Sequence, residues 1–126
     1  MYFSSENFSY RKLVVYQHAR AFNKTVYILL KKFPVEERFA LCDQMRRAAS
    51  SIPSNIAECS GRISKKEKLR FIEYAQGSLS ETMCQLELSF DVGYINKAEL
   101  DSMDEKAIVI QKLLSGLYNS YNDYHK

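Results

Sequence analysis

The sequence predicts an all-α fold, an antiparallel up-down-up-down four-helix bundle, on three observations. Apolar residues recur at steps of three and four along four successive segments, the spacing of a buried helix face. Only four glycines and two prolines occur among the 126 residues, and strand-like alternation is nearly absent. The segments are joined by short connections, which favour antiparallel neighbours. We therefore expect one domain over residues 1–126, with its core over about residues 10–121.

Each predicted helix carries one apolar stripe. The four stripes, in chain order, are Val15, Ala19, Phe22, Val26, Leu29 and Phe33; Leu41, Met45, Ala48 and Ile52; Leu69, Ile72, Gln76, Leu79, Met83, Leu86 and Phe90; and Leu100, Met103, Ala107, Ile110, Leu114, Leu117 and Tyr121. This alternating spacing is typical of the core positions of packed helices.

Helix ends are marked by residues that stop or cap a helix. Phe33 precedes Pro34, so the first helix is expected to end there and Pro34 to open the second. The sequences 64–67 and 96–99 read as capping boxes, in which two residues three apart bond each other's backbone amides. Gly61 and Gly93 stand where the second and third helices should end. The third helix would then span about 28 residues, or about 42 Å.

Composition indicates a cytoplasmic protein. The three cysteines, Cys42, Cys59 and Cys84, are odd in number and lack the spacing of a zinc site, so we expect reduced, mostly packed thiols. The first ten residues do not resemble a secretion signal. The longest apolar run, residues 26–30, is far too short to span a membrane.

Charge is distributed unevenly along the chain. Residues 1–70 hold 14 basic and 6 acidic side chains, a formal charge of +8, whereas residues 71–126 hold 4 basic and 9 acidic ones, a charge of −5. Such asymmetry suggests a surface that faces a polyanion. The alternative is that basic and acidic helices pair with each other inside the bundle.

The first two helices carry more apolar residues than one stripe needs. The additional residues are Leu13, Val14, Tyr16, Tyr27, Ile28, Leu30, Phe39, Ala49 and Ile56. A helix that is apolar on two faces is usually buried on two faces. Either the bundle core is wide, or the second face meets another subunit; we favour the subunit contact.

A proline lies inside the second helix. Pro53 removes one backbone donor and collides with the carbonyl four residues earlier, so we expect a kink or break near residues 49–53. Ser50 and Ser51 could satisfy the freed backbone groups. Asn55 and Glu58, three residues apart, share a face. That face could be a buried polar patch, a subunit contact or a ligand site.

Several motifs resemble one known family. They are Val15-Tyr16-Gln17, Phe33-Pro34 with Glu37-Arg38-Phe39, the run from Gln44 to Glu58 around Arg46-Arg47 and Ser51-Ile52-Pro53, Gly77-Ser78 with Glu81, and Gln85-Leu86-Glu87. Residues 13–117 resemble the four-helix-bundle proteins encoded in intervening sequences of bacterial 23S rRNA genes, which are related to the accessory proteins of diversity-generating retroelements. The family usually has glycine where this chain has Cys59, so the backbone at that helix end is open to question.

The resemblance implies an assembly and partners. The resemblance implies a homopentamer arranged around a central pore. It also implies a partner, because the retroelement relatives use a basic surface to engage nucleic acid and a reverse transcriptase. An established catalytic activity is not implied. Pro53, Asn55 and Glu58 would then be structural features of the motif.

Catalytic and metal-binding constellations are not apparent, so we expect a non-enzymatic protein without a cofactor or metal. The two histidines, His18 and His125, lack a carboxylate or cysteine at ligand spacing. Gly77 is expected to allow close helix packing.

The basic residues near the second connection carry the functional expectation. They are Arg46, Arg47, Arg62, Lys65, Lys66, Lys68 and Arg70, with the first two about two dozen Å from the rest if the helix is straight. One hypothesis is an oligomeric adaptor that associates with RNA or DNA through these cations. The other is a protein-interaction or scaffolding ring that touches no nucleic acid.

Overall fold

The computed structural model describes residues 7–124 and confirms the all-α bundle. Its helices are a 3₁₀ turn η1 (Ser9–Lys12), then α1 (Val14–Leu30), a 3₁₀ turn η2 (Val35–Glu37), α2 (Leu41–Gly61), α3 (Lys65–Asp91) and α4 (Lys97–Tyr124). Strands are absent from these residues. At 27 residues, α3 has almost the predicted length.

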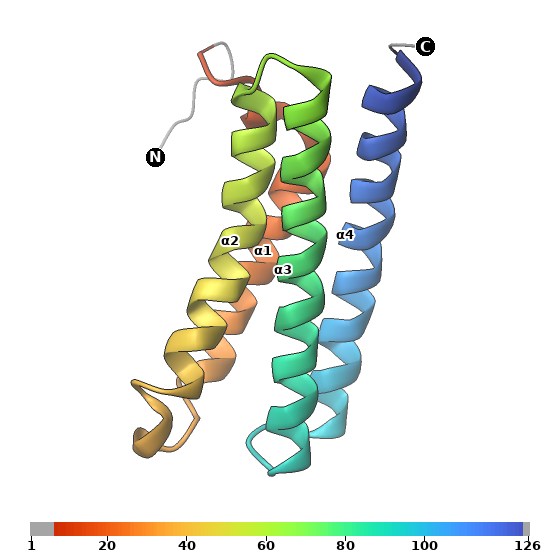
Figure 1. Ribbon diagram of the computed structural model, residues 1–126. Coiled ribbons are helices and arrows are strands. Elements are labelled where there is room, and N and C mark those ends of the chain that lie inside the picture. Colours follow the sequence, from red (N-terminus) through yellow and green to blue (C-terminus); the bar gives the residue numbers. More distant parts are fainter. Residues whose placement is uncertain (1–6, 125–126) are drawn as a thin grey trace.

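The four long helices run alternately up and down (Figure 1). Each packs against its sequence neighbours, and α4 closes the bundle against α1. Consequently α1 and α3 lie diagonally across the bundle and do not contact each other. The α2–α3 connection lies at the same end as the start of α1 and the end of α4, and the α1–α2 and α3–α4 connections lie at the opposite end.

The core is built from the predicted stripes. All six stripe residues of the first helix are buried, as are three of the four from the second. Phe22, Ile52, Leu86, Met103 and Ile110 are among the largest side chains that are fully removed from solvent. The stripe positions that are not buried are half-buried at the core's margin. Helical periodicity therefore located the core correctly.

A second face of α3 is also buried, although its side chains are small or polar. Thr82 and Ser89 are fully buried, and each hydroxyl donates to a carbonyl one turn earlier in α3, at 2.8 and 2.7 Å. Ser51 of α2 hydrogen-bonds Ser78 of α3. Gln85 is buried as well. The α2–α3 contact thus combines apolar packing with hydroxyls that are satisfied within their own helix.

The helix caps follow the prediction in part. The Asn96 box is complete, because the Glu99 amide donates to Asn96 Oδ1 at 2.8 Å and the Asn96 amide to Glu99 Oε1 at 2.9 Å. At Ser64 the hydroxyl accepts from the Glu67 amide at 3.2 Å, but the Glu67 carboxylate pairs with Arg70 instead of reaching back.

The two glycines differ. Gly93 adopts φ +84°, and the amide of Tyr94 behind it donates to the Ser89 carbonyl at 2.9 Å, which closes α3. Gly61 is the last residue of α2, but Gly93 is the one described glycine with positive φ. The prediction that the second helix ends at Gly61 is therefore confirmed, but without a left-handed residue, because Arg62 leaves the helix in an extended conformation.

The first connection is longer than predicted. Pro34 begins the short turn η2, whereas α2 starts later, after Ala40. The prediction that Pro34 opens the second helix is therefore wrong. Phe39 lies in this connection with 87 % of its surface exposed. Its exposure follows from its position, because a turn residue beyond the helix has no neighbouring helix to pack on.

The additional apolar residues divide between core and surface. Leu30, Ala49 and Ile56 are buried in the bundle, so part of the excess reflects a wide core. Val14 and Ile28 stay exposed on α1. This division leaves apolar surface on the outside of the bundle.

Helix α2 continues through its proline. It is helical from Leu41 to Gly61 with Pro53 inside, so of the two predicted alternatives, a kink or a break, the break is wrong. Figure 1 shows α2 bending, with its first half leaning away from α3. Ser50 and Ser51 donate to the carbonyls of Arg47 and Ala48, at 3.3 and 3.1 Å. Pro53 has no amide to donate to the Ala49 carbonyl, but the two serines bond the carbonyls just before it. The prediction that they satisfy the freed group is therefore wrong.

Replacing this proline should change stability little. Pro53→Ala restores an amide donor, worth up to about 3 kcal/mol of helix propensity, but straightens a helix whose bend fits its neighbours. We expect the free energy of unfolding, measured in urea, to change by less than about 1 kcal/mol. Stabilisation by several kcal/mol, with an unchanged fold, would show that the bend contributes nothing.

Candidate nucleic-acid interface

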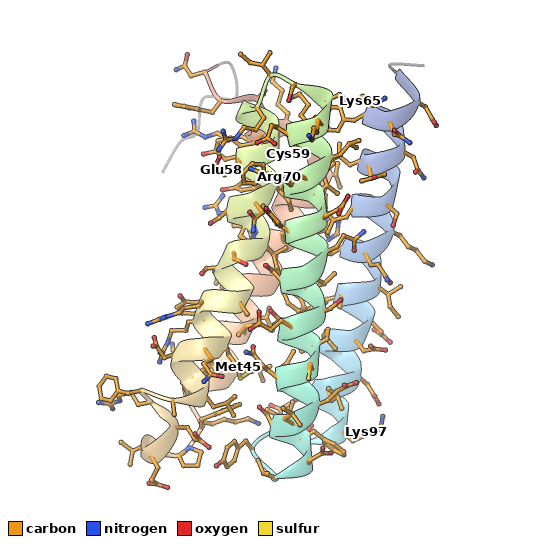
Figure 2. All side chains as sticks on the ribbon, viewed as in Figure 1. Met45, Glu58, Cys59, Lys65, Arg70 and Lys97 are labelled. Atoms are coloured by element: carbon orange, nitrogen blue, oxygen red, sulfur yellow. The ribbon has the colours of Figure 1, made fainter. Side chains whose placement is uncertain are left out.

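Five of the seven predicted cations gather at one end of the bundle. Arg62 follows α2, and Lys65, Lys66, Lys68 and Arg70 lie in the first turns of α3. Figure 2 shows Lys65 and Arg70 at this end, beside Glu58 near the end of α2. We call these five residues the basic end.

Two of these cations have no acidic partner in the described part of the chain. Lys65 and Lys66 occupy the first turn of α3 and form no ion pair within residues 7–124. The exposed amides of a helix start carry partial positive charge, which favours anions over cations. Two lysines at this position therefore strengthen the attraction for an anion.

The two arginines are paired but accessible. Arg62 contacts Glu58 at 3.0 Å, and Arg70 contacts Glu67 at 2.9 Å. Both guanidinium groups lie over the ring of Phe71, at 4.7 and 5.5 Å from its centre. Surface ion pairs of this kind contribute about 0–1 kcal/mol, so a phosphate can replace the carboxylate at little cost.

Lys68 has a structural role instead. Its ammonium donates to the carbonyls of Cys59 and Ser60 at 3.3 and 3.4 Å, and lies 5.2 Å from the centre of the Tyr121 ring. It thereby satisfies carbonyls at the end of α2 and ties α4 to this end. Of the five cations, Lys68 is the least available to a ligand.

Arg46 and Arg47 lie elsewhere. They precede Arg62 by about four turns of α2, or about 24 Å, near the opposite end of the bundle. Arg47 is 80 % exposed at its side chain and pairs with Asp43 at 3.0 Å. Arg46 is half-buried. The predicted set of seven is thus two separate groups.

The structure adds two cations that the sequence analysis missed. Arg11 and Lys12 belong to η1, which packs against α2 near its end; the hydroxyls of Ser9 and Ser60 are 2.9 Å apart. These residues are about fifty positions from the basic end in sequence. Because only tertiary packing brings them there, periodicity and local motifs gave no signal for them.

Comparison with known proteins identifies the family. The sequence model of the family described as "23S rRNA-intervening sequence protein" matches residues 11–116. The chain belongs to the 23S rRNA-intervening sequence protein family. A crystal structure of a protein of unknown function from the S23 ribosomal protein family of Bacteroides thetaiotaomicron VPI-5482 is similar: 26 % identity, TM-score 0.77, covering 84 % of this chain and 96 % of the other. Among curated proteins, none matches the chain.

The motif residues of this 23S rRNA-intervening sequence protein have local roles. Asn55 is half-buried and donates to the Ser51 carbonyl at 2.8 Å, which stabilises the helix beside Pro53. Glu58 is exposed and holds Arg62. Gly77 is exposed, and a Cβ there would meet nothing within 4 Å. The expectation of a close helix approach at Gly77 is therefore wrong.

The cysteine that departs from the family pattern fits the helix. Cys59 is fully buried and α2 continues through it, so the substitution leaves the helix end regular. Burial raises the pKa of the Cys59 thiol to about 11, against a smaller opposing effect of Lys68. Cys42 is also buried, whereas Cys84 is exposed. Cys59 is thus a neutral core residue.

The described residues contain neither a metal-ligand cluster nor a helix that could span a membrane. Within residues 7–124, His, Cys, Asp and Glu side chains nowhere form a group of three that could hold a metal ion. His18 is exposed, and His125 lies outside the described residues. The described helices are all too short or too polar to cross a bilayer.

Proposed function

We propose that this chain is a non-enzymatic, cytoplasmic protein that forms a ring of five copies and binds RNA or DNA through its basic end. The observation that carries the proposal is the convergence of Arg62, Lys65, Lys66 and Arg70 with Arg11 and Lys12 at one end of the bundle. Exposed, mobile cations are what phosphate contacts require. The family's description, which refers to 23S rRNA, supports a nucleic-acid context.

Two exposed apolar stripes support assembly into a ring. On α1 the stripe contains Val14, Ala21 and Ile28, spaced seven apart; we call it the α1 stripe. On α3 the exposed apolar side chains Tyr74 and Leu88 lie fourteen residues apart on one face, with Glu81 midway between them; we call this pair the α3 stripe. Because α1 and α3 are diagonal in the bundle, the stripes face different directions. Rings form when two different surfaces meet head to tail, which is what this arrangement allows.

Charge near the stripes is complementary. Helix α1 contains Arg20 and Lys24 and no acidic residue, whereas α3 from residue 71 onwards contains Glu73, Glu81, Glu87 and Asp91 and no basic residue. Packing α1 of one copy on α3 of the next would place opposite charges together. Within one copy, Lys32–Glu99 is the single ion pair between elements found in residues 7–124; the others are local.

Salt dependence tests the nucleic-acid contact. We expect labelled RNA and DNA to bind with little sequence preference, in fluorescence anisotropy from about 50 to 200 mM salt. The log–log slope should be about −0.9 per phosphate neutralised on duplex and about −0.7 on single strands. Replacing Lys65, Lys66 and Arg70 by glutamine should make that slope less steep. Replacing Lys97, Lys106 and Lys112 of α4 removes the same charge elsewhere and should have a smaller effect.

The second candidate function is a scaffolding ring without a nucleic-acid contact, and the exposed apolar stripes favour it equally. An intact oligomer that fails to bind at about 50 mM salt would leave this candidate standing. If both triple variants change the slope alike, the contact depends on net charge and not on the basic end.

A further inference from the structure

A polar pocket lies between the end of α1 and the start of α2. It encloses about 260 Å³ and is lined by Phe33, Pro34 and Cys42 together with Lys31, Arg38 and Arg46. In Figure 1 the α1–α2 connection lies at the end of the bundle opposite the α2–α3 turn. The pocket is therefore separate from the basic end.

The three cations of this pocket have no acidic partner among residues 7–124. Elsewhere Arg47, Arg62 and Arg70 each contact a carboxylate within one turn, at 2.9 to 3.0 Å. In the described part of the chain, Lys31, Arg38 and Arg46 form no ion pair. Arg46 is moreover half-buried, so its charge is partly removed from water without compensation from a carboxylate.

The turn η2 holds two acidic residues: Glu36 is exposed and forms no ion pair in the described part of the chain, and Glu37 directs its carboxylate to another partner. Glu37 accepts a hydrogen bond from the Tyr94 hydroxyl at 2.8 Å, and this bond raises the pKa of Tyr94. Glu37 thus connects η2 to the α3–α4 connection and does not pair with the pocket cations. The positive charge of the pocket remains available to a ligand.

We propose that this pocket binds the phosphate group of a small phosphomonoester. Three cations that line one cavity match a dianionic phosphate, and the planar forks of Arg38 and Arg46 suit its oxygens. The volume is slightly below the range of pockets for drug-sized ligands, which favours a phosphate with a small substituent. Phe33 and Pro34 provide an apolar wall for that substituent.

Inorganic phosphate and glycerol phosphate are the probes. We expect saturable binding of one phosphate per chain by isothermal titration calorimetry at constant ionic strength, with acetate at least tenfold weaker. If glycerol phosphate binds more tightly than inorganic phosphate, the substituent contacts the apolar wall. Equal affinity assigns the site to free phosphate. The proposal would be overturned if phosphate showed no saturable binding up to about 20 mM, or if acetate bound as strongly as phosphate.

Two adjacent arginines provide matched variants. Arg46→Gln and Arg38→Gln should each weaken phosphate binding at least tenfold, whereas Arg47→Gln, one residue away but outside the pocket, should change it less than twofold. Equal losses in all three would overturn the site.

Amide signals of the wild-type chain give a test that does not depend on the folding of a variant. Phosphate should shift the backbone amide signals of the pocket residues Lys31, Arg38 and Cys42. The amide signals of Lys65 and Lys66 at the basic end should not move. Shifts confined to the basic end would overturn the pocket site while leaving the nucleic-acid proposal intact.

Discussion

Light scattering at micromolar concentration is expected to show a particle of about 74 kDa, which is five copies of the 14.7 kDa chain. Ile28→Asp in the α1 stripe and Leu88→Asp in the α3 stripe should each reduce it to 14.7 kDa. Both side chains are exposed in the single chain, so a charge there leaves the fold intact. In the proposed interface the same charge would be buried without a partner.

Mixing the two variants tests whether the stripes meet each other. One variant keeps an intact α3 stripe and the other an intact α1 stripe, so together they can form a single interface. We therefore expect a heterodimer of about 29 kDa, two copies of 14.7 kDa, and no larger species. A mixture that stays monomeric would show that the stripes do not pair with each other. Ile63→Asp, in the α2–α3 turn, is the matched control and should remain near 74 kDa.

The free energy of unfolding should depend strongly on one isoleucine and hardly at all on another. Ile52 is fully buried, whereas Ile63 is 98 % exposed. Ile52→Ala leaves a cavity between packed helices and should lower the free energy of unfolding by about 2–5 kcal/mol. Ile63→Ala deletes the same atoms from a solvated position and should change it by less than about 0.5 kcal/mol.

Urea unfolding followed by far-UV circular dichroism measures both variants. The loss at Ile52 is a large fraction of the 5–15 kcal/mol typical of a folded domain. Similar effects at the two positions would contradict the assigned burial. A large loss at Ile63 that depends on protein concentration would instead place this residue in a subunit contact.

The sequence determined the helices and most of the core, because helical periodicity is a local property. The six stripe residues of the first helix, from Val15 to Phe33, are all buried, and the Asn96 box caps α4 as expected. The family resemblance was also carried by local motifs, and the match over residues 11–116 confirms it.

Tertiary structure decided what depends on residues that are distant in sequence. Ser89 is buried because α2 covers it, with Met45 Sδ 3.7 Å from its hydroxyl, and apolar periodicity cannot reveal burial of a polar side chain. Arg11 reaches the basic end because η1 packs on α2. Lys31 and Arg46 line one pocket because the end of α1 lies beside the start of α2. In each case the contact joins residues of separate elements. The interaction that stabilises it therefore cannot be predicted from any single stretch of the sequence.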